Sequence, residues 1–153
     1  MHNLNQILNQ LESKIPHHTV MNADVSQTDA GWHMEHSMLT INGITNSLIK
    51  SNPDLYKGKF KLIKLIVFTM GKIPRGKAKA PKVVQPSSAI SKDSLMKHLE
   101  ETRLKINELK TLSNDKYFDH PVFGHLKLKD TIRFLEIHTN HHLKIVEDIL
   151  KEK

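Results

Sequence analysis

Four long stretches of the chain repeat apolar residues every three or four positions, and this spacing constrains the fold more than any other feature. The repeat is clearest from Leu128 to Leu150 and also covers Leu4 to Ile15, Trp32 to Lys50 and Lys92 to Leu112. Such spacing places apolar side chains on one face of an α-helix. A shorter apolar stretch, from Phe60 to Met70, favours one more helix, with a strand as the alternative. We therefore predict an all-α protein in which four long helices and a short extra helix form a bundle.

The segment from Gly71 to Ile90 interrupts the helical pattern with an irregular, basic excursion. It holds three of the six prolines and two of the six glycines, which favour turns and loops. A chain of 153 residues has the size of one ordinary domain. We interpret the excursion as an insertion within a single domain that covers residues 1–153.

The absence of cysteine limits the chemistry that this chain can carry out. Without thiolates, a metal site would have to use histidine, aspartate or glutamate side chains. The first residues have neither the basic start nor the apolar core of an export signal, and no apolar run approaches the roughly 18 residues that span a bilayer. These patterns predict a cytoplasmic protein without a membrane span.

The net charge of +7 comes from one segment. Nine lysines and arginines lie between Lys57 and Lys82, and no acidic residue occurs between Asp54 and Asp93. Only Phe60 and Phe68 interleave with these charges, and both fit better as core residues. We therefore favour a solvated loop and helix face over a surface for nucleic acid or anionic lipid. Binding of anions or partners through residues 57–82 is the alternative function.

Within the short helix, we expect lysines to face water and apolar residues to face the bundle. The predicted solvent side carries Lys57, Lys61 and Lys64. The predicted apolar cover consists of Leu62, Ile63, Leu65, Ile66 and Phe68.

Two histidines of the last helix point toward the predicted core at a spacing that suits a metal ion. At about 100° per residue, His142 lies near the centre of the apolar stripe, His138 about 40° from it, and His141 about 100° from it, at the edge. Residues four apart stack on one helix face, so His138 and His142 can share one ion with a ligand from a facing helix. Among the remaining histidines, His36 is the one on a predicted inward stripe.

A core cluster of histidines held by hydrogen bonds is the alternative to a metal site, and spacing alone leaves both open. Three desolvated imidazoles without a metal would each need hydrogen-bond partners. Each unsatisfied buried group would cost about 1–3 kcal/mol. A bound metal is the simpler solution.

Three segments carry a resemblance to a known family. Residues 31–37 read Gly-Trp-His-Met-Glu-His-Ser, residues 120–126 read His-Pro-Val-Phe-Gly-His-Leu, and residues 137–143 read Ile-His-Thr-Asn-His-His-Leu. Together they resemble the DinB-like superfamily of metal-binding bundles. More narrowly, they resemble its branch labelled as a domain of unknown function, whose members carry a His-Pro-x-Phe-Gly loop followed by His-x-x-His-His. The similarity extends from about Asp29 onward.

The resemblance implies a DinB-like four-helix bundle with a three-histidine site for a divalent metal. By motif position the ligands are His36, His138 and His142, and zinc, nickel, manganese and iron all suit them. Related superfamily members include thiol transferases and metal-dependent hydrolases. The implied substrate is a small molecule, with a low-molecular-weight thiol as one candidate. Because the chain has no cysteine, that thiol would have to be external.

Other residues near the motifs are candidates for acid–base roles. They are His33, His141 and Glu35, although a surface position is the simpler interpretation for each. We expect His98 on a solvated helix face. A metal-free bundle acting as a structural or sensor protein is a third possibility for function. The predicted helix from Trp32 to Lys50 is apolar on two sides, which is compatible with pairing into a homodimer.

The loop before the last helix carries a predicted anchor. Pro121 fixes φ, and Gly124 can adopt a left-handed turn, so the chain can fold back over one end of the bundle. We expect Phe123 to be buried there and to set the direction of the last helix.

Overall fold

The computed structural model of the protein describes residues 2–76, 82–86 and 89–151. Most of these residues are helical, in five α-helices joined by loops and short 3₁₀ turns. The helices are α1 (His2–Glu12), α2 (Ala30–Lys50), α3 (Leu62–Met70), α4 (Lys92–Leu109) and α5 (Leu128–Leu150). The predicted helices therefore all form, and α5 has the predicted bounds. Lys77 and Lys79 of the predicted basic segment lie outside the described residues.

Polar side chains fix where the helices begin. The Asp29 carboxylate accepts a hydrogen bond from the Trp32 amide at 2.7 Å and caps α2. Ser91 and Ser94 form a reciprocal capping box at the start of α4. The cap of α2 fixes the position of its first turns, which carry His33 and His36.

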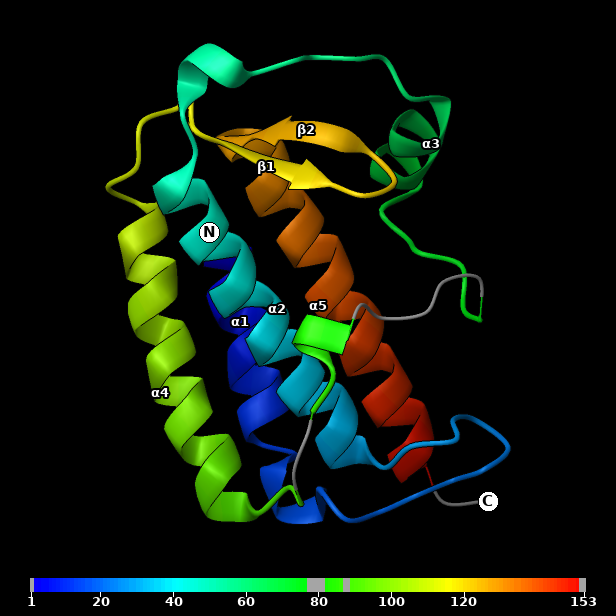
Figure 1. The fold of residues 1–153 in the computed structure, drawn as a ribbon. Helices are drawn as coiled ribbons and strands as arrows, with labels where there is room; N and C mark the ends of the chain where they lie inside the picture. Colours follow the sequence, from blue (N-terminus) through cyan, green and yellow to red (C-terminus); the bar gives the residue numbers. More distant parts are fainter. Residues whose placement is uncertain (1, 77–81, 87–88, 152–153) are drawn as a thin grey trace.

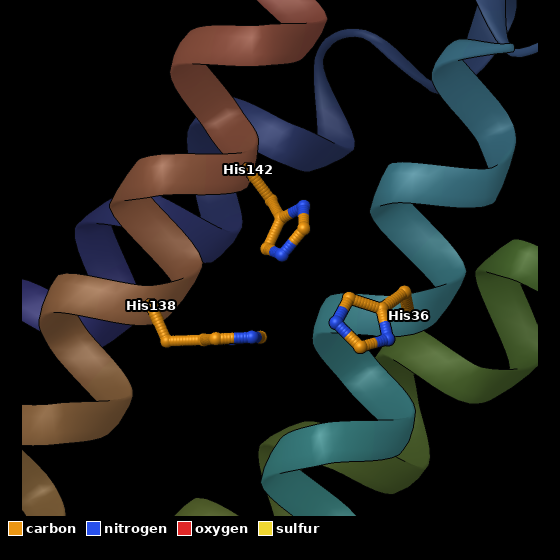
Figure 2. Close-up of side chains that lie close together, drawn as sticks. All are labelled: His36, His138 and His142. Atoms are coloured by element: carbon orange, nitrogen blue, oxygen red, sulfur yellow. The ribbon is translucent and has the colours of Figure 1, made fainter. Parts of the chain in front are cut away.

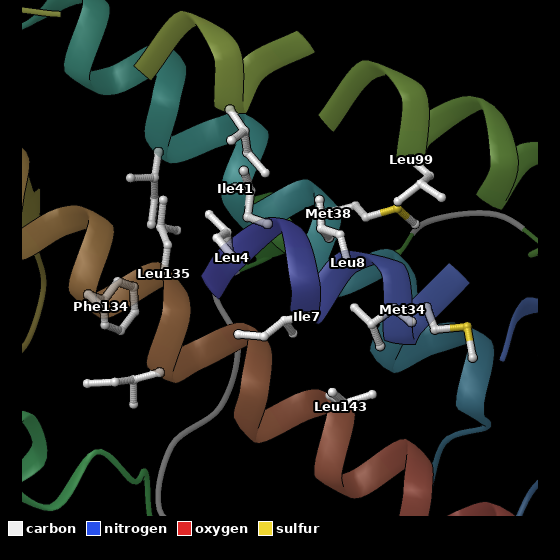
Figure 3. Close-up of a cluster of buried hydrophobic side chains, with 14 of the residues drawn as sticks. Leu4, Ile7, Leu8, Met34, Met38, Ile41, Leu99, Phe134, Leu135 and Leu143 are labelled. Atoms are coloured by element: carbon white, nitrogen blue, oxygen red, sulfur yellow. The ribbon is translucent and has the colours of Figure 1, made fainter. Parts of the chain in front are cut away.

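The four long helices lie side by side around one apolar core (Figure 1). α2 contacts α4 and α5, and α1 contacts the same two helices from the other side of the core. The core side chains come from all four helices and include Leu8, Met38, Leu99 and Leu135 (Figure 3). Because each long helix turns its apolar stripe toward the others, burial of these stripes explains the arrangement.

A small antiparallel hairpin lies across the end of the bundle, where the sequence predicted only a loop (Figure 1). β1 (Tyr117–His120) pairs with β2 (Gly124–Lys127), and Phe118 faces Leu126 in the register. Gly124 has φ of 71°, the left-handed conformation that glycine adopts without strain. Phe123 is buried, as predicted. The strands were missed because four-residue strands are too short to show a clear alternation.

The orientation of α3 differs from the predicted one, although Lys57 and Lys61 are exposed and Phe68 packs against the core, as expected. Val67 is buried and Phe68 is half-buried, whereas the four aliphatic residues expected to cover the core, Leu62, Ile63, Leu65 and Ile66, are exposed. Phe60 is also exposed and not part of the core. Lys64, expected on the solvent side, instead forms an ion pair with Asp130 of α5. The physical reason is that the four long helices already cover one another's apolar stripes, so α3 buries only its Val67 and Phe68 side against the core.

None of the helices among the described residues is long and apolar enough to cross a membrane.

Candidate metal centre

Three histidines from two helices meet inside the bundle, as their motif positions predicted. His36 comes from α2, and His138 and His142 come from successive turns of α5 (Figure 2). One ring nitrogen from each histidine lies within 4.8 Å of the corresponding nitrogens of the other two. His36 and His142 are buried, and His138 is half-buried. We call these three residues the histidine triad.

His36 is held in place by a backbone carbonyl and by an aromatic ring. Its Nδ1 lies 2.7 Å from the carbonyl oxygen of Val84, so Nδ1 carries the proton and donates it in a hydrogen bond. The indole of Trp32 stacks on its ring, with centroids 5.0 Å apart. The hydrogen bond leaves the Nε2 lone pair of His36 free to bind an ion. Val84 belongs to a 3₁₀ turn (Lys82–Val84) of the basic excursion, which thus helps to build the site.

His142 is oriented by a second histidine that is not a member of the triad. Its Nδ1 lies 3.0 Å from Nδ1 of His33, and Nε2 of His33 lies 2.9 Å from the Ser26 hydroxyl. If His142 uses Nε2 to bind a metal, its Nδ1–H donates to His33, which in turn donates from Nε2 to Ser26. His33 is buried, so the surface position that we expected for it was wrong.

His138 carries an unsatisfied polar atom. Its Nδ1 is fully buried and has no hydrogen-bond partner among the described residues. Its ring packs between those of Phe134, at 5.5 Å, and His142, at 4.7 Å. A buried polar atom without a partner costs about 1–3 kcal/mol, and a metal ion would remove this cost only by binding to Nδ1 itself.

Burial keeps the triad in the neutral form that binds metals. It is the largest cause of the lowered pKa of His36, His138 and His142, because a charged imidazole is poorly solvated there. The neighbouring triad histidines lower the pKa of His138 and His142 further. The hydrogen bond to Val84 opposes the decrease for His36. All three imidazoles are thus neutral at pH 7 and need not lose a proton to bind an ion.

His141 lies at the edge of the site, at the predicted position. It is half-buried, and its ring centroid is 5.1 Å from that of His142. Burial lowers its pKa first and the charge of Arg75 second, so the ring is neutral at pH 7. His141 is not one of the three residues whose nitrogens converge.

Glu35 faces a different part of the molecule from the triad. It is buried, not on the surface as expected, and its Oε1 lies 2.6 Å from Nδ1 of His98 on α4. Both residues line a small cavity of about 140 Å³ between α2 and α4. Burial raises the pKa of Glu35 and His98 opposes that change. His98 is half-buried in this contact and not on the solvated face that we expected. Because Glu35 faces His98 and not the triad, it is an unsuitable acid or base for the triad.

Sequence reasoning missed two features that position the triad. The bond between His33 and His142 was detectable in part, because His33 lies three residues before His36 and so close to the same helix face. The Val84 carbonyl had no signal in the sequence, because a backbone oxygen is not encoded by residue type. Its role depends on how the excursion folds back against α2.

The fold and the triad define a helical protein with a buried three-histidine centre of metal-ligand geometry. Residues 2–149 match the family described as "Protein of unknown function (DUF1569)", and the chain belongs to that family. The chain matched no curated protein and no solved structure in these comparisons.

Proposed function

We propose that the protein is a metal-dependent enzyme of the DinB-like superfamily, built on that superfamily's four-helix bundle. Its triad of His36, His138 and His142 would hold a divalent ion that activates water, as in a hydrolase, or an external thiol, as in a thiol S-transferase. The observation that carries the proposal is the convergence of three neutral imidazoles inside a helical core. The motif resemblance described above supports the same assignment.

The contacts of the triad fit a metal ion better than a purely structural cluster. His36 and His142 each direct Nδ1 to a protein partner and so leave Nε2 for an ion. His138 directs one ring nitrogen to within 4.8 Å of those of His36 and His142. Three imidazole ligands are typical of catalytic sites, which keep a further coordination position open. An all-imidazole set suits zinc, nickel, iron or manganese better than magnesium or calcium, which prefer oxygen.

The residues around the triad have distinct roles in this proposal. A divalent cation bound there stabilises the deprotonated form of water or of a thiol. His33 holds the His142 ring in one orientation, and Val84 does the same for His36. His141, neutral at pH 7 and half-buried at the rim, is the candidate to accept a proton from the substrate.

Metal binding is tested by titrating the chelator-treated protein with Zn²⁺ in a calorimeter. We expect one ion per chain, and at least a hundredfold weaker binding for His138→Ala. His17→Ala, at an exposed histidine of the 3₁₀ turn Ile15–His17, is the matched control and should bind like the wild type. Absence of stoichiometric binding by the wild type, or equal losses in the two variants, would contradict the proposal.

The two reaction classes are separated by the Co²⁺-loaded protein. If a thiol is the activated molecule, adding a small thiol should produce a new near-ultraviolet charge-transfer band, because a thiolate donates electron density to cobalt. If water is activated, the spectrum should not change with thiol and should instead change with pH. His36→Ala, which lacks a ligand, should show neither response.

A further inference from the structure

The outward face of α3 is apolar, although it is exposed to solvent. Phe60, just before the helix, is 78% exposed, Leu65 is 52% exposed and Met70 is 63% exposed. Leu62, Ile63 and Ile66 are exposed as well. At about 100° per residue, the exposed apolar side chains of the helix span an arc of about 160°, interrupted by Thr69 alone. Exposed apolar surface of this extent usually marks an interaction site.

The inner side of α3 fixes this orientation. Val67 is buried, and the Phe68 ring meets that of Phe123 in the hairpin at 5.9 Å. Lys64 forms its ion pair with Asp130 on the same side. α3 lies at the edge of the molecule, beside the hairpin (Figure 1). Turning the apolar arc inward would break these contacts, so the arc is available to a partner in the folded protein.

Positive charge flanks the apolar arc along the chain. Lys57, Lys59 and Lys61 are exposed on the segment that enters α3, and Lys72 is exposed just after it. The backbone amide of Lys57 donates a hydrogen bond to Nδ1 of His125 at 2.8 Å, which attaches this segment to the hairpin. No acidic residue occurs between Asp54 and Asp93, so Lys59, Lys61 and Lys72 have no carboxylate within four residues in the sequence. The partner should therefore be negatively charged.

We infer that α3 and the lysines of residues 57–61 dock the protein on an anionic lipid surface. The convex apolar arc can enter the boundary between headgroups and acyl chains, while the lysines reach the phosphates. A second copy of the chain fits less well, because pairing two arcs would bring two sets of lysines together. This inference concerns a different surface from the triad and does not rest on the proposed metal chemistry.

Vesicle co-sedimentation tests the inference. The protein should bind vesicles of phosphatidylcholine mixed with phosphatidylglycerol, bind those of phosphatidylcholine alone at least tenfold less, and dissociate as salt is raised. Leu65→Asp should weaken binding about tenfold or more, because it places a carboxylate in the apolar arc next to anionic headgroups. Leu104→Asp is the matched control, since Leu104 is a 65% exposed leucine on α4. It should bind like the wild type.

The following four outcomes would each overturn the inference. No binding by the wild type rejects it, as does an equal loss in Leu65→Asp and Leu104→Asp. Sedimentation velocity of the same proteins tests for a second copy: a dimer that Leu65→Asp dissociates, without vesicle binding, would make the arc a subunit interface. Binding to polyglutamate but not to mixed vesicles would make the partner an acidic polypeptide. Retention of vesicle binding by His138→Ala would show that the lipid surface is independent of the triad.

Discussion

His33 illustrates how one side chain outside the ligand set can control a metal site. Its Nδ1 lies 3.0 Å from Nδ1 of His142. When Nε2 of His142 binds an ion, Nδ1 of His33 accepts a hydrogen bond from Nδ1–H of His142. We predict that His33→Phe lowers Zn²⁺ affinity about 10–100-fold, because His142 loses the partner that orients it. Competition with a fluorescent chelator measures this. His33→Gln, which can restore an acceptor, should recover part of the affinity; equal affinity in all three proteins would exclude an orienting role.

His120 provides a pH prediction at the same scale. Its ring stacks on Phe123, and burial lowers its pKa from 6.5 to about 4. Between these two values the unfolded chain binds more protons than the folded one, so the free energy of unfolding should fall as pH falls from 6.5 toward 4. The contribution of His120 is at most about 3 kcal/mol. Denaturant unfolding of the metal-free protein across this range should show a shallower dependence for His120→Gln. An unchanged slope would contradict burial of a neutral ring.

At the scale of elements, the hairpin sets the start of α5 through Phe123. The ring is buried and meets Phe68, His120 and Phe134. Phe123→Ala should destabilise the protein by about 3–5 kcal/mol and weaken Zn²⁺ binding, because α5 carries two of the three ligands. Thermal unfolding and Zn²⁺ titration measure both effects. Val122→Ala, at the exposed neighbouring residue, is the control. If Phe123→Ala keeps its stability and its metal but loses activity, Phe123 contacts the substrate and is not an anchor.

At the scale of the whole molecule, an ion in the triad would tie α2 to α5. Ligands that bind only the folded state stabilise it by mass action, by about 2.7 kcal/mol at a concentration one hundred times Kd. We therefore expect Zn²⁺ at that concentration to raise the melting temperature by about 5–10 °C for a chain of this size. Differential scanning fluorimetry measures the shift. His36→Ala should lose it; a shift of the same size in that variant would place the ion elsewhere.

The helices and the pairing of two metal-ligand candidates on one helix face follow from local patterns in the sequence. Periodicity encodes which face of a segment is apolar, and this predicted all five helices and the bounds of α5. The four-residue spacing of His138 and His142 predicted that they share one helix face, because residues four apart lie one turn apart on the same helix. The burial of Phe123 followed from the turn chemistry of Pro121 and Gly124.

Which faces of these helices are buried depends on contacts between segments that are distant in the sequence. α3 has apolar residues on most of its circumference, so its periodicity could not indicate which side faces the bundle. Its orientation depends on the packing of the four long helices and on the ion pair between Lys64 and Asp130. The burial of His33 and Glu35 depends on α5 and α4, which are distant in sequence. The Val84 carbonyl is a backbone atom and leaves no pattern of residue types. These features arise from contacts between segments that are distant in the sequence, and a local sequence pattern does not indicate how strong such contacts are.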